Sequence, residues 1–180
     1  DLVKDSIALA QQIKVPENAA SIATFQLPGY DYVRSMLATW MLKKVFVPLQ
    51  TRHSPRELQY IMLDSKASAV LYSKSDDNEE NIQNHHRYDC LNSFGVPLID
   101  TDNIDNSSFL SCKPLAGCWE EGAHISNDPD DGALVLYTSG TTGLPKGVLH
   151  TQSSLEHQVK SLVSAWDYSD QDKALHFLPL

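Results

Sequence analysis

One stretch of this 180-residue sequence decides its fold: Ala133-Leu134-Val135-Leu136-Tyr137-Thr138-Ser139-Gly140-Thr141-Thr142-Gly143-Leu144-Pro145-Lys146-Gly147. The first four residues form an apolar run that predicts a buried strand. The last eleven contain three glycines, four serine and threonine hydroxyls, one proline and one lysine. Glycines let backbone N–H groups approach a phosphate, hydroxyls donate to its oxygens, and a lysine offsets its charge. The stretch therefore predicts a phosphate site at the end of a buried strand.

The Walker A loop, G-x-x-x-x-G-K-[ST], is the obvious phosphate motif to compare, and this stretch does not match it. Gly140 and Gly143 are too close together, and Lys146 is followed by Gly147 instead of Ser or Thr. A polar surface loop that happens to contain lysine is the alternative interpretation. The ordered combination of glycines, hydroxyls and lysine favours phosphate binding.

Strand-like and helix-like segments alternate on both sides of this loop. Ser54-Pro55-Arg56-Glu57 is a capping box with proline at the first helical position, so a helix is predicted from Pro55 to about Asp64. Alternating strands and helices predict an α/β fold, with a mostly parallel sheet and helices on both faces. Helical patterns occupy 2–13, 32–41 and 155–166; strands are predicted at 20–27, 45–49, 68–72, 96–99, 133–137, 147–150 and 174–178; polar loops are predicted at 73–95 and 101–131.

Composition limits the classes of function. The net charge of −9 argues against a general nucleic-acid surface. The apolar runs are far shorter than the roughly 18 residues that indicate a membrane span, so no transmembrane segment is expected. Apolar residues make up 42% of the chain, which is enough for the core of one soluble domain.

The cysteines indicate a reducing, intracellular location, either cytoplasmic or mitochondrial. Cys90, Cys112 and Cys118 are an odd set without a C-x-x-C pair, so a disulfide framework is not expected. His85-His86 near Cys90 matches no common zinc spacing, and no metal site is predicted from these residues.

The stretch Thr138–Gly147 resembles the signature of the AMP-forming acyl-adenylate superfamily, T-S-G-[TS]-T-G-x-P-K-G. This superfamily includes acyl-CoA synthetases, luciferases and peptide-synthetase adenylation domains. Val47-Pro48-Leu49 resembles its early G-G-x-x-V-P-L segment, although Lys43-Lys44 stands where small residues are usual. Gly147-Val148-Leu149-His150-Thr151 and His176-Phe177-Leu178-Pro179-Leu180 look most like the malonyl-CoA synthetase branch.

The resemblance implies that residues 1–180 form a partial N-terminal AMP-binding domain, about the first third of such an enzyme. Its reaction joins a small-molecule carboxylate, here malonate, to CoA through an acyl-adenylate made from ATP. The Mg²⁺ ligand, the adenine contacts, the CoA site and the second catalytic lysine of this family would lie beyond Leu180. The fragment alone is therefore expected to be inactive.

The resemblance also assigns roles within the loop. Lys146 is the catalytic residue that contacts the phosphates and stabilises pyrophosphate as it leaves. Glycines let the backbone approach the nucleotide, and hydroxyls donate to its β- and γ-phosphates; turn capping is the alternative role for Ser139 and Thr142. The expected nucleotide-binding residues are Thr138, Ser139, Gly140, Thr141, Thr142, Gly143 and Lys146.

Three functions remain open from the sequence. The first is an acyl-CoA synthetase that activates malonate. The second is another adenylate-forming ligase with the same loop, such as a fatty acyl-CoA or coumarate-CoA enzyme. The third is a truncated, non-catalytic nucleotide-binding module.

Overall fold

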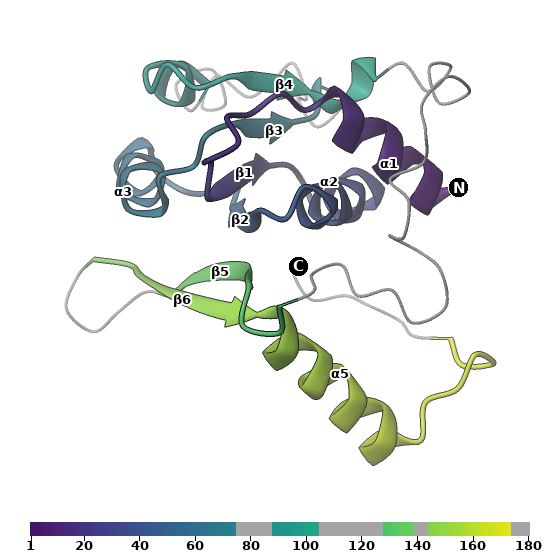
Figure 1. The fold of residues 1–180 in the computed structure, drawn as a ribbon. Coiled ribbons are helices and arrows are strands. Elements are labelled where there is room, and N and C mark those ends of the chain that lie inside the picture. Colours follow the sequence, from purple (N-terminus) through teal and green to yellow (C-terminus); the bar gives the residue numbers. More distant parts are fainter. Residues whose placement is uncertain (75–87, 105–127, 139–143, 174–180) are drawn as a thin grey trace.

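A computed structural model describes residues 1–74, 88–104, 128–138 and 144–173, which form one sheet with helices packed against it (Figure 1). The order of its six strands is β4-β3-β1-β2-β5-β6. The strands are β1 (Ser21–Phe25), β2 (Val45–Leu49), β3 (Val70–Tyr72), β4 (Leu98–Asp100), β5 (Gly132–Thr138) and β6 (Lys146–Thr151).

Neighbouring strands from β4 to β5 are parallel, and only β6 runs antiparallel, beside β5. The predicted α/β fold with a mostly parallel sheet is therefore confirmed. Parallel neighbours need crossover connections, and helices supply them between β1, β2 and β3. The longer helices are α1 (Leu2–Gln12), α2 (Tyr30–Met41), α3 (Pro55–Ser65) and α5 (Gln152–Trp166), and a 3₁₀ turn lies at Thr101–Asn103.

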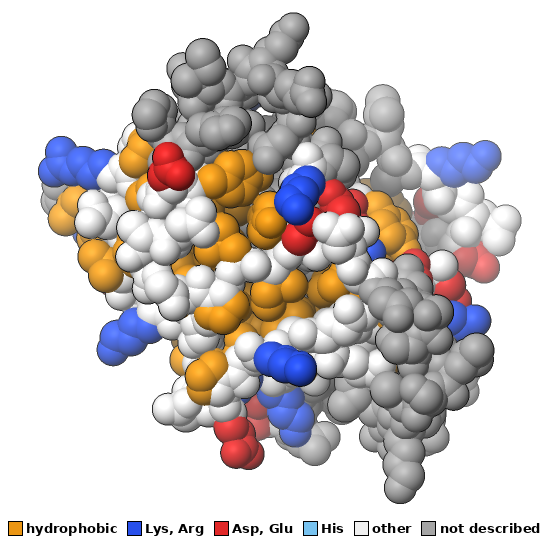
Figure 2. Space-filling view, turned by 90° about the horizontal axis from the view of Figure 1, so that it is seen from above, with side chains coloured by type: hydrophobic (Ala, Val, Ile, Leu, Met, Phe, Trp, Pro, Cys, Tyr) orange, Lys and Arg blue, Asp and Glu red, His pale blue; other side chains and the backbone are white. Residues whose placement is uncertain are grey.

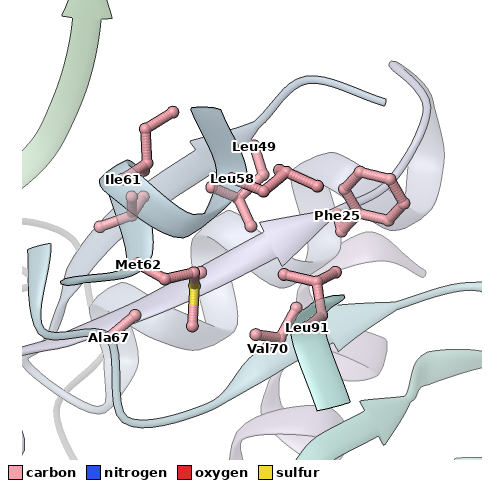
Figure 3. Close-up of a cluster of buried hydrophobic side chains, with 10 residues drawn as sticks. Phe25, Leu49, Leu58, Ile61, Met62, Ala67, Val70 and Leu91 are labelled. Atoms are coloured by element: carbon pink, nitrogen blue, oxygen red, sulfur yellow. The ribbon is translucent and has the colours of Figure 1, made fainter. Parts of the chain in front are cut away.

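Two buried clusters show that helices cover both faces of the parallel strands. On one face, Leu9 of α1 and Met41 of α2 pack with Ile22 and Leu71. On the other face, α3 packs against β1, β2 and β3, as Figure 3 shows. The labelled residues of that cluster are Phe25, Leu49, Leu58, Ile61, Met62, Ala67, Val70 and Leu91.

The start of α3 is fixed by its first residues, as predicted. The backbone N–H of Glu57 donates to the Ser54 hydroxyl over 3.3 Å, and the backbone N–H of Ser54 donates to the Glu57 carboxylate over 2.8 Å. This reciprocal capping box satisfies amides that have no partner inside the helix. The Ser54 backbone N–H, and second its hydroxyl, donate to the Glu57 carboxylate and hold the pKa of Glu57 below its usual value.

Residues 88–92 are helical, so the prediction of polar loop across 73–95 is wrong at this point. Leu91 is completely buried in the α3 cluster. The Tyr88 ring packs edge-on against Phe25, with centroids 5.5 Å apart, and against Tyr72 at 5.6 Å. Tyr88 and Leu91 lie one helical turn apart in a polar segment. Their burial is therefore enough to pack this short helix against the sheet. The 3₁₀ turn at Thr101–Asn103 likewise replaces the start of the second predicted loop.

Other strand predictions hold with shifted bounds. The strand predicted at 20–27 is shorter, and the one predicted at 96–99 lies at Leu98–Asp100. The strand predicted at 174–178 lies outside the described residues.

The hairpin β5–β6 and α5 extend from the β2 side of the sheet (Figure 1). Helix α5 has no buried residue, and Val159, Val163 and Trp166 are exposed along it. Figure 2 looks down on the opposite, β4 side, where Lys and Arg side chains of the described residues are scattered among acidic and apolar ones. Within the described residues, no helix combines the length and hydrophobicity needed to cross a bilayer.

Candidate phosphate-binding site

The predicted loop joins two adjacent antiparallel strands. Thr138, the last residue of β5, pairs with Lys146, the first residue of β6. The Thr138 hydroxyl donates to the Lys146 carbonyl oxygen over 3.5 Å. The structure thus brings together the two expected site residues that it describes. The others, Ser139, Gly140, Thr141, Thr142 and Gly143, lie outside the described residues.

Lys146 and Thr138 are both exposed at the loop end of the hairpin. No carboxylate among the described residues forms an ion pair with Lys146, whereas Lys74 and Lys160 pair with Asp100 and Glu156. The Lys146 ammonium group is consequently free to meet an anion from solution, and the Thr138 hydroxyl lies on the neighbouring strand. A polyphosphate needs this combination of a cation and a hydroxyl donor.

Strand β5 lies beside β2, and its Val135 and Tyr137 pack against the buried cluster of α3. The β2–β5 ladder has one register pair, Phe46 with Leu134. Next to it, Trp40 of α2 donates its indole N–H to the Ala133 carbonyl oxygen over 2.8 Å. Ala133 is completely buried, so this hydrogen bond satisfies an acceptor that water does not reach.

A second side-chain contact lies at the loop end of β5. The Tyr137 phenol donates to the Asp64 carboxylate, near the end of α3, over 2.7 Å. The Tyr60 ring meets the Tyr137 ring edge-on, with centroids 6.5 Å apart. Burial first, and then the hydrogen bond to Asp64, raise the Tyr137 pKa above its usual value because both disfavour the phenolate.

Gly147 of the motif lies beneath that tyrosine. It pairs with Tyr137 across the hairpin. A Cβ atom placed on Gly147 would lie 3.1 Å from Cζ of Tyr137 and 3.1 Å from Cγ1 of Val135. These distances are tighter than ordinary van der Waals contact, so glycine at this position makes room for the ring.

Sequence reasoning did not assign roles to Tyr137, Asp64, Tyr60 or Trp40. The sequence did offer one signal for Tyr137. This aromatic residue directly precedes the motif, and Gly147, ten positions later, pairs with it across the hairpin. Asp64 is 73 residues away from Tyr137 and gave no local signal.

The histidines add no chemistry to this site among the described residues. His150, predicted to be structural, is a partly buried β6 residue that pairs with Leu134. His157 is exposed on α5, as expected, and its ring contacts the Ser153 carbonyl oxygen of its own helix at 2.7 Å. His85-His86 and His176 lie outside the described residues. The part of the chain that the structure describes holds no group of three His, Cys, Asp or Glu residues suited to a metal ion.

The fold places the chain in the class of α/β proteins with a mostly parallel sheet, and a family model narrows this class. The model for AMP-binding enzymes matches residues 8–180. The chain belongs to this family.

Two curated relatives and one solved structure illustrate the similarity. A malonate–CoA ligase of Arabidopsis thaliana is 34% identical over 163 residues, covering 89% of this chain and 25% of that protein. The mitochondrial malonate–CoA ligase ACSF3 of Homo sapiens is 35% identical over 154 residues, covering 83% of this chain and 24% of that protein. ATP-bound MatB from Rhodopseudomonas palustris superposes with a TM-score of 0.68 at 22% identity, covering 99% of this chain and 34% of that one. The chain therefore spans about a quarter of the length of these curated relatives.

Proposed function

We propose that residues 1–180 are the N-terminal part of the AMP-binding domain of an acid–CoA ligase, and that the whole protein activates malonate. Family membership and the malonate–CoA ligases at 34% and 35% identity support this proposal. The observation that carries it is the placement of exposed Lys146 directly across from Thr138, at the two ends of the signature loop.

The proposed reaction has two steps. A carboxylate oxygen of malonate attacks the α-phosphorus of ATP, the bond from that phosphorus to the bridging oxygen breaks, and pyrophosphate leaves. The CoA thiolate then attacks the acyl carbon of the mixed anhydride and displaces AMP, which gives the thioester. A carboxylate reacts poorly with thiols because its leaving group would be oxide, and adenylation replaces that leaving group with AMP.

Residues of this chain serve the first step. Negative charge builds on pyrophosphate as it departs, and a positioned cation lowers the energy of that state. Lys146 supplies the cation, and the Thr138 hydroxyl donates to the phosphates. Ser139, Thr141 and Thr142 add hydroxyl donors, while Gly140 and Gly143 let the backbone approach.

The proposal includes ATP as nucleotide and CoA as co-substrate. MatB, whose fold this chain shares, binds ATP, which supports the choice of nucleotide. We expect Mg²⁺ to accompany the nucleotide and screen its phosphates; the described residues offer no metal cluster, so we assign none of them to it. The mitochondrial human relative favours mitochondria as the compartment over the cytoplasm.

The test uses the whole protein that contains this chain. We measure ATP–pyrophosphate exchange and thioester formation with malonate, acetate and palmitate on one preparation. A pocket that pairs the second carboxylate leaves a cation unpaired when a monoacid binds, so malonate should lead by about a hundredfold or more in kcat/KM. The 180-residue chain alone, assayed in parallel, should form no thioester.

Two outcomes would replace this proposal. Preference for palmitate would move the protein to the other adenylate-forming ligases while leaving the role of the loop intact. Absence of exchange with every acid, from protein that binds ATP, would support a non-catalytic nucleotide-binding module.

A further inference from the structure

The loop end of β5 lies beyond the residue that pairs with β2. Its one register pair with β2 is at Leu134, and Tyr137 lies three residues further on, about 10 Å along an extended strand. On its other side β5 pairs only with β6, the second strand of the same hairpin. The hydrogen bond from Tyr137 to Asp64 and the contact of the Tyr137 ring with Tyr60 join the loop end of the hairpin to α3.

Asp64 is an unexpected residue for its place in the helix. It lies in the last turn of α3, where the helix dipole disfavours a carboxylate, and that turn contains no basic residue. Its position therefore weakens α3 slightly. The 2.7 Å hydrogen bond from the Tyr137 phenol gives this carboxylate a role outside its own helix.

Gly147 completes the arrangement. Its missing side chain leaves room for the Tyr137 ring, and the Tyr60 ring packs nearly perpendicular to that ring. Any side chain at Gly147 would press on Cζ of that ring, which carries the phenol oxygen, and on the adjacent Cε1. The last glycine of the motif thereby protects the contact with Asp64.

We propose that Tyr137 is a positioning residue for the phosphate loop: its phenol, held by Asp64, and its ring, seated on Gly147, fix the two loop ends against α3. We call this arrangement the Tyr137–Asp64 anchor. The proposal rests on the proposed function, because it assigns the anchor an effect on ATP binding. When the loop ends can sample several positions, only a fraction of molecules is ready to bind, and the apparent affinity falls by that fraction.

The anchor predicts a specific kinetic pattern in the whole protein. Tyr137→Phe removes the phenol oxygen and keeps the ring, so KM for ATP should rise about three- to tenfold, the range for one lost hydrogen bond of ordinary net strength. The KM values for malonate and CoA, and kcat at saturating ATP, should stay within about twofold of the parent protein.

Matched variants isolate the hydrogen bond. Asp64→Ala should raise KM for ATP as Tyr137→Phe does, and the double variant should add less than about twofold to either, because both remove one interaction. Tyr60→Phe is the control: it removes a phenol oxygen from the adjacent ring and should leave KM for ATP within about twofold. Gly147→Ala should raise KM for ATP in the parent protein but add little in the Tyr137→Phe variant.

Backbone amide exchange gives a second measurement that does not depend on catalysis. Amides of residues 136–138 and 146–148 should exchange about three- to tenfold faster in Tyr137→Phe than in Tyr60→Phe, while β1 amides stay unchanged. If the parent protein shows no exchange of pyrophosphate with any acid, the proposed function fails, and amide exchange still decides whether the anchor exists.

Three results would overturn the anchor. One is an unchanged KM for ATP in Tyr137→Phe together with unchanged amide exchange beside the loop. Another is an equal effect of Tyr60→Phe, which would indicate ring packing instead of the hydrogen bond. The third is a parallel rise in KM for ATP, malonate and CoA, which would indicate general loosening of the fold.

Discussion

Two regions of the molecule differ sharply in how much of their surface they bury. The first region consists of β1 to β4 with α1 to α3, and the second is the unit β5–β6–α5. All five residues of β1 are buried, and each of α1, α2 and α3 contributes at least three buried residues. In α5 no residue is buried, and Trp166 keeps 65% of its surface exposed. The first region contains both buried clusters of the described residues.

This difference separates the residues expected to determine stability from those proposed to bind the nucleotide. The signature loop belongs to the less buried unit, which meets the rest through the β2–β5 ladder, the packing of Val135 and Tyr137 on the α3 cluster, and the side chain of Trp40. Substitutions in the first region should therefore have the larger effect on the free energy of unfolding. Nucleotide binding should depend on the contacts between the first region and the β5–β6–α5 unit. The substitutions that follow are made in the 180-residue chain unless the whole protein is named.

The largest expected difference comes from the same change made in each region. Leu58→Ala in α3 removes a completely buried side chain and should lower the free energy of unfolding by about 2–5 kcal/mol. Leu162→Ala in α5 removes a side chain that is 39% exposed and should cost less than about 1 kcal/mol. Urea unfolding of both variants measures the two losses in free energy of unfolding. Equal losses would contradict the division of the molecule into a buried and a less buried region. A larger cost of Leu162→Ala in the whole protein would show that further chain packs on α5.

The second prediction concerns the contact between α2 and β5. Trp40→Phe leaves the buried Ala133 carbonyl without its indole donor, which should cost about 1–3 kcal/mol and speed amide exchange along β5. Trp166→Phe is the matched control on exposed α5, with an expected effect within about 0.5 kcal/mol. If β5 exchanges at the parent rate in Trp40→Phe, the indole does not hold the strand.

A third comparison uses the helix caps. Ser54→Ala removes the capping box of α3, which packs in the core, and should lower global stability by about 1 kcal/mol. Thr151 caps α5 by accepting from the Ser154 amide at 3.1 Å. Thr151→Ala should reduce the helicity of α5 and leave the urea midpoint of the β1–β4 region unchanged. A fall in that midpoint equal to the Ser54→Ala loss would mean that the two regions unfold as one.

The smallest expected effect appears at alkaline pH. The Tyr137 pKa is raised in the folded chain above the usual 10, so folding favours the neutral phenol. Its stabilising contribution is complete below about pH 10, and it is lost progressively as the pH rises from there toward the folded pKa. Tyr137→Phe should make the decline of stability above about pH 10 shallower. If the free energy of unfolding declines equally with pH in the parent and Tyr137→Phe chains, Tyr137 does not contribute to this pH dependence.

Local signals in the sequence were enough for most of the fold. The capping box located α3, and apolar runs located β2 and β5, because those features depend on neighbouring residues. The helix at 88–92 was missed because its docking depends on Tyr88 and Leu91 meeting β1 and β3, which are distant in sequence. The pairing of Thr138 with Lys146 follows from a short hairpin, whereas the Tyr137–Asp64 contact required the tertiary arrangement of α3 beside β5. The expected roles of residues 139–143 stay predictions.

The most direct test of the account is Lys146→Ala in the whole protein, measured by ATP–pyrophosphate exchange and by AMP binding. Loss of one positioned charge should slow exchange about ten- to a thousandfold. AMP affinity should change less than about threefold, because AMP lacks the β- and γ-phosphates that Lys146 is proposed to contact. Lys160→Ala, which removes an exposed lysine of α5, is the control and should leave both values unchanged. Equal losses of exchange and AMP affinity in Lys146→Ala, or no loss of either, would contradict the assignment of this loop to the phosphates of ATP.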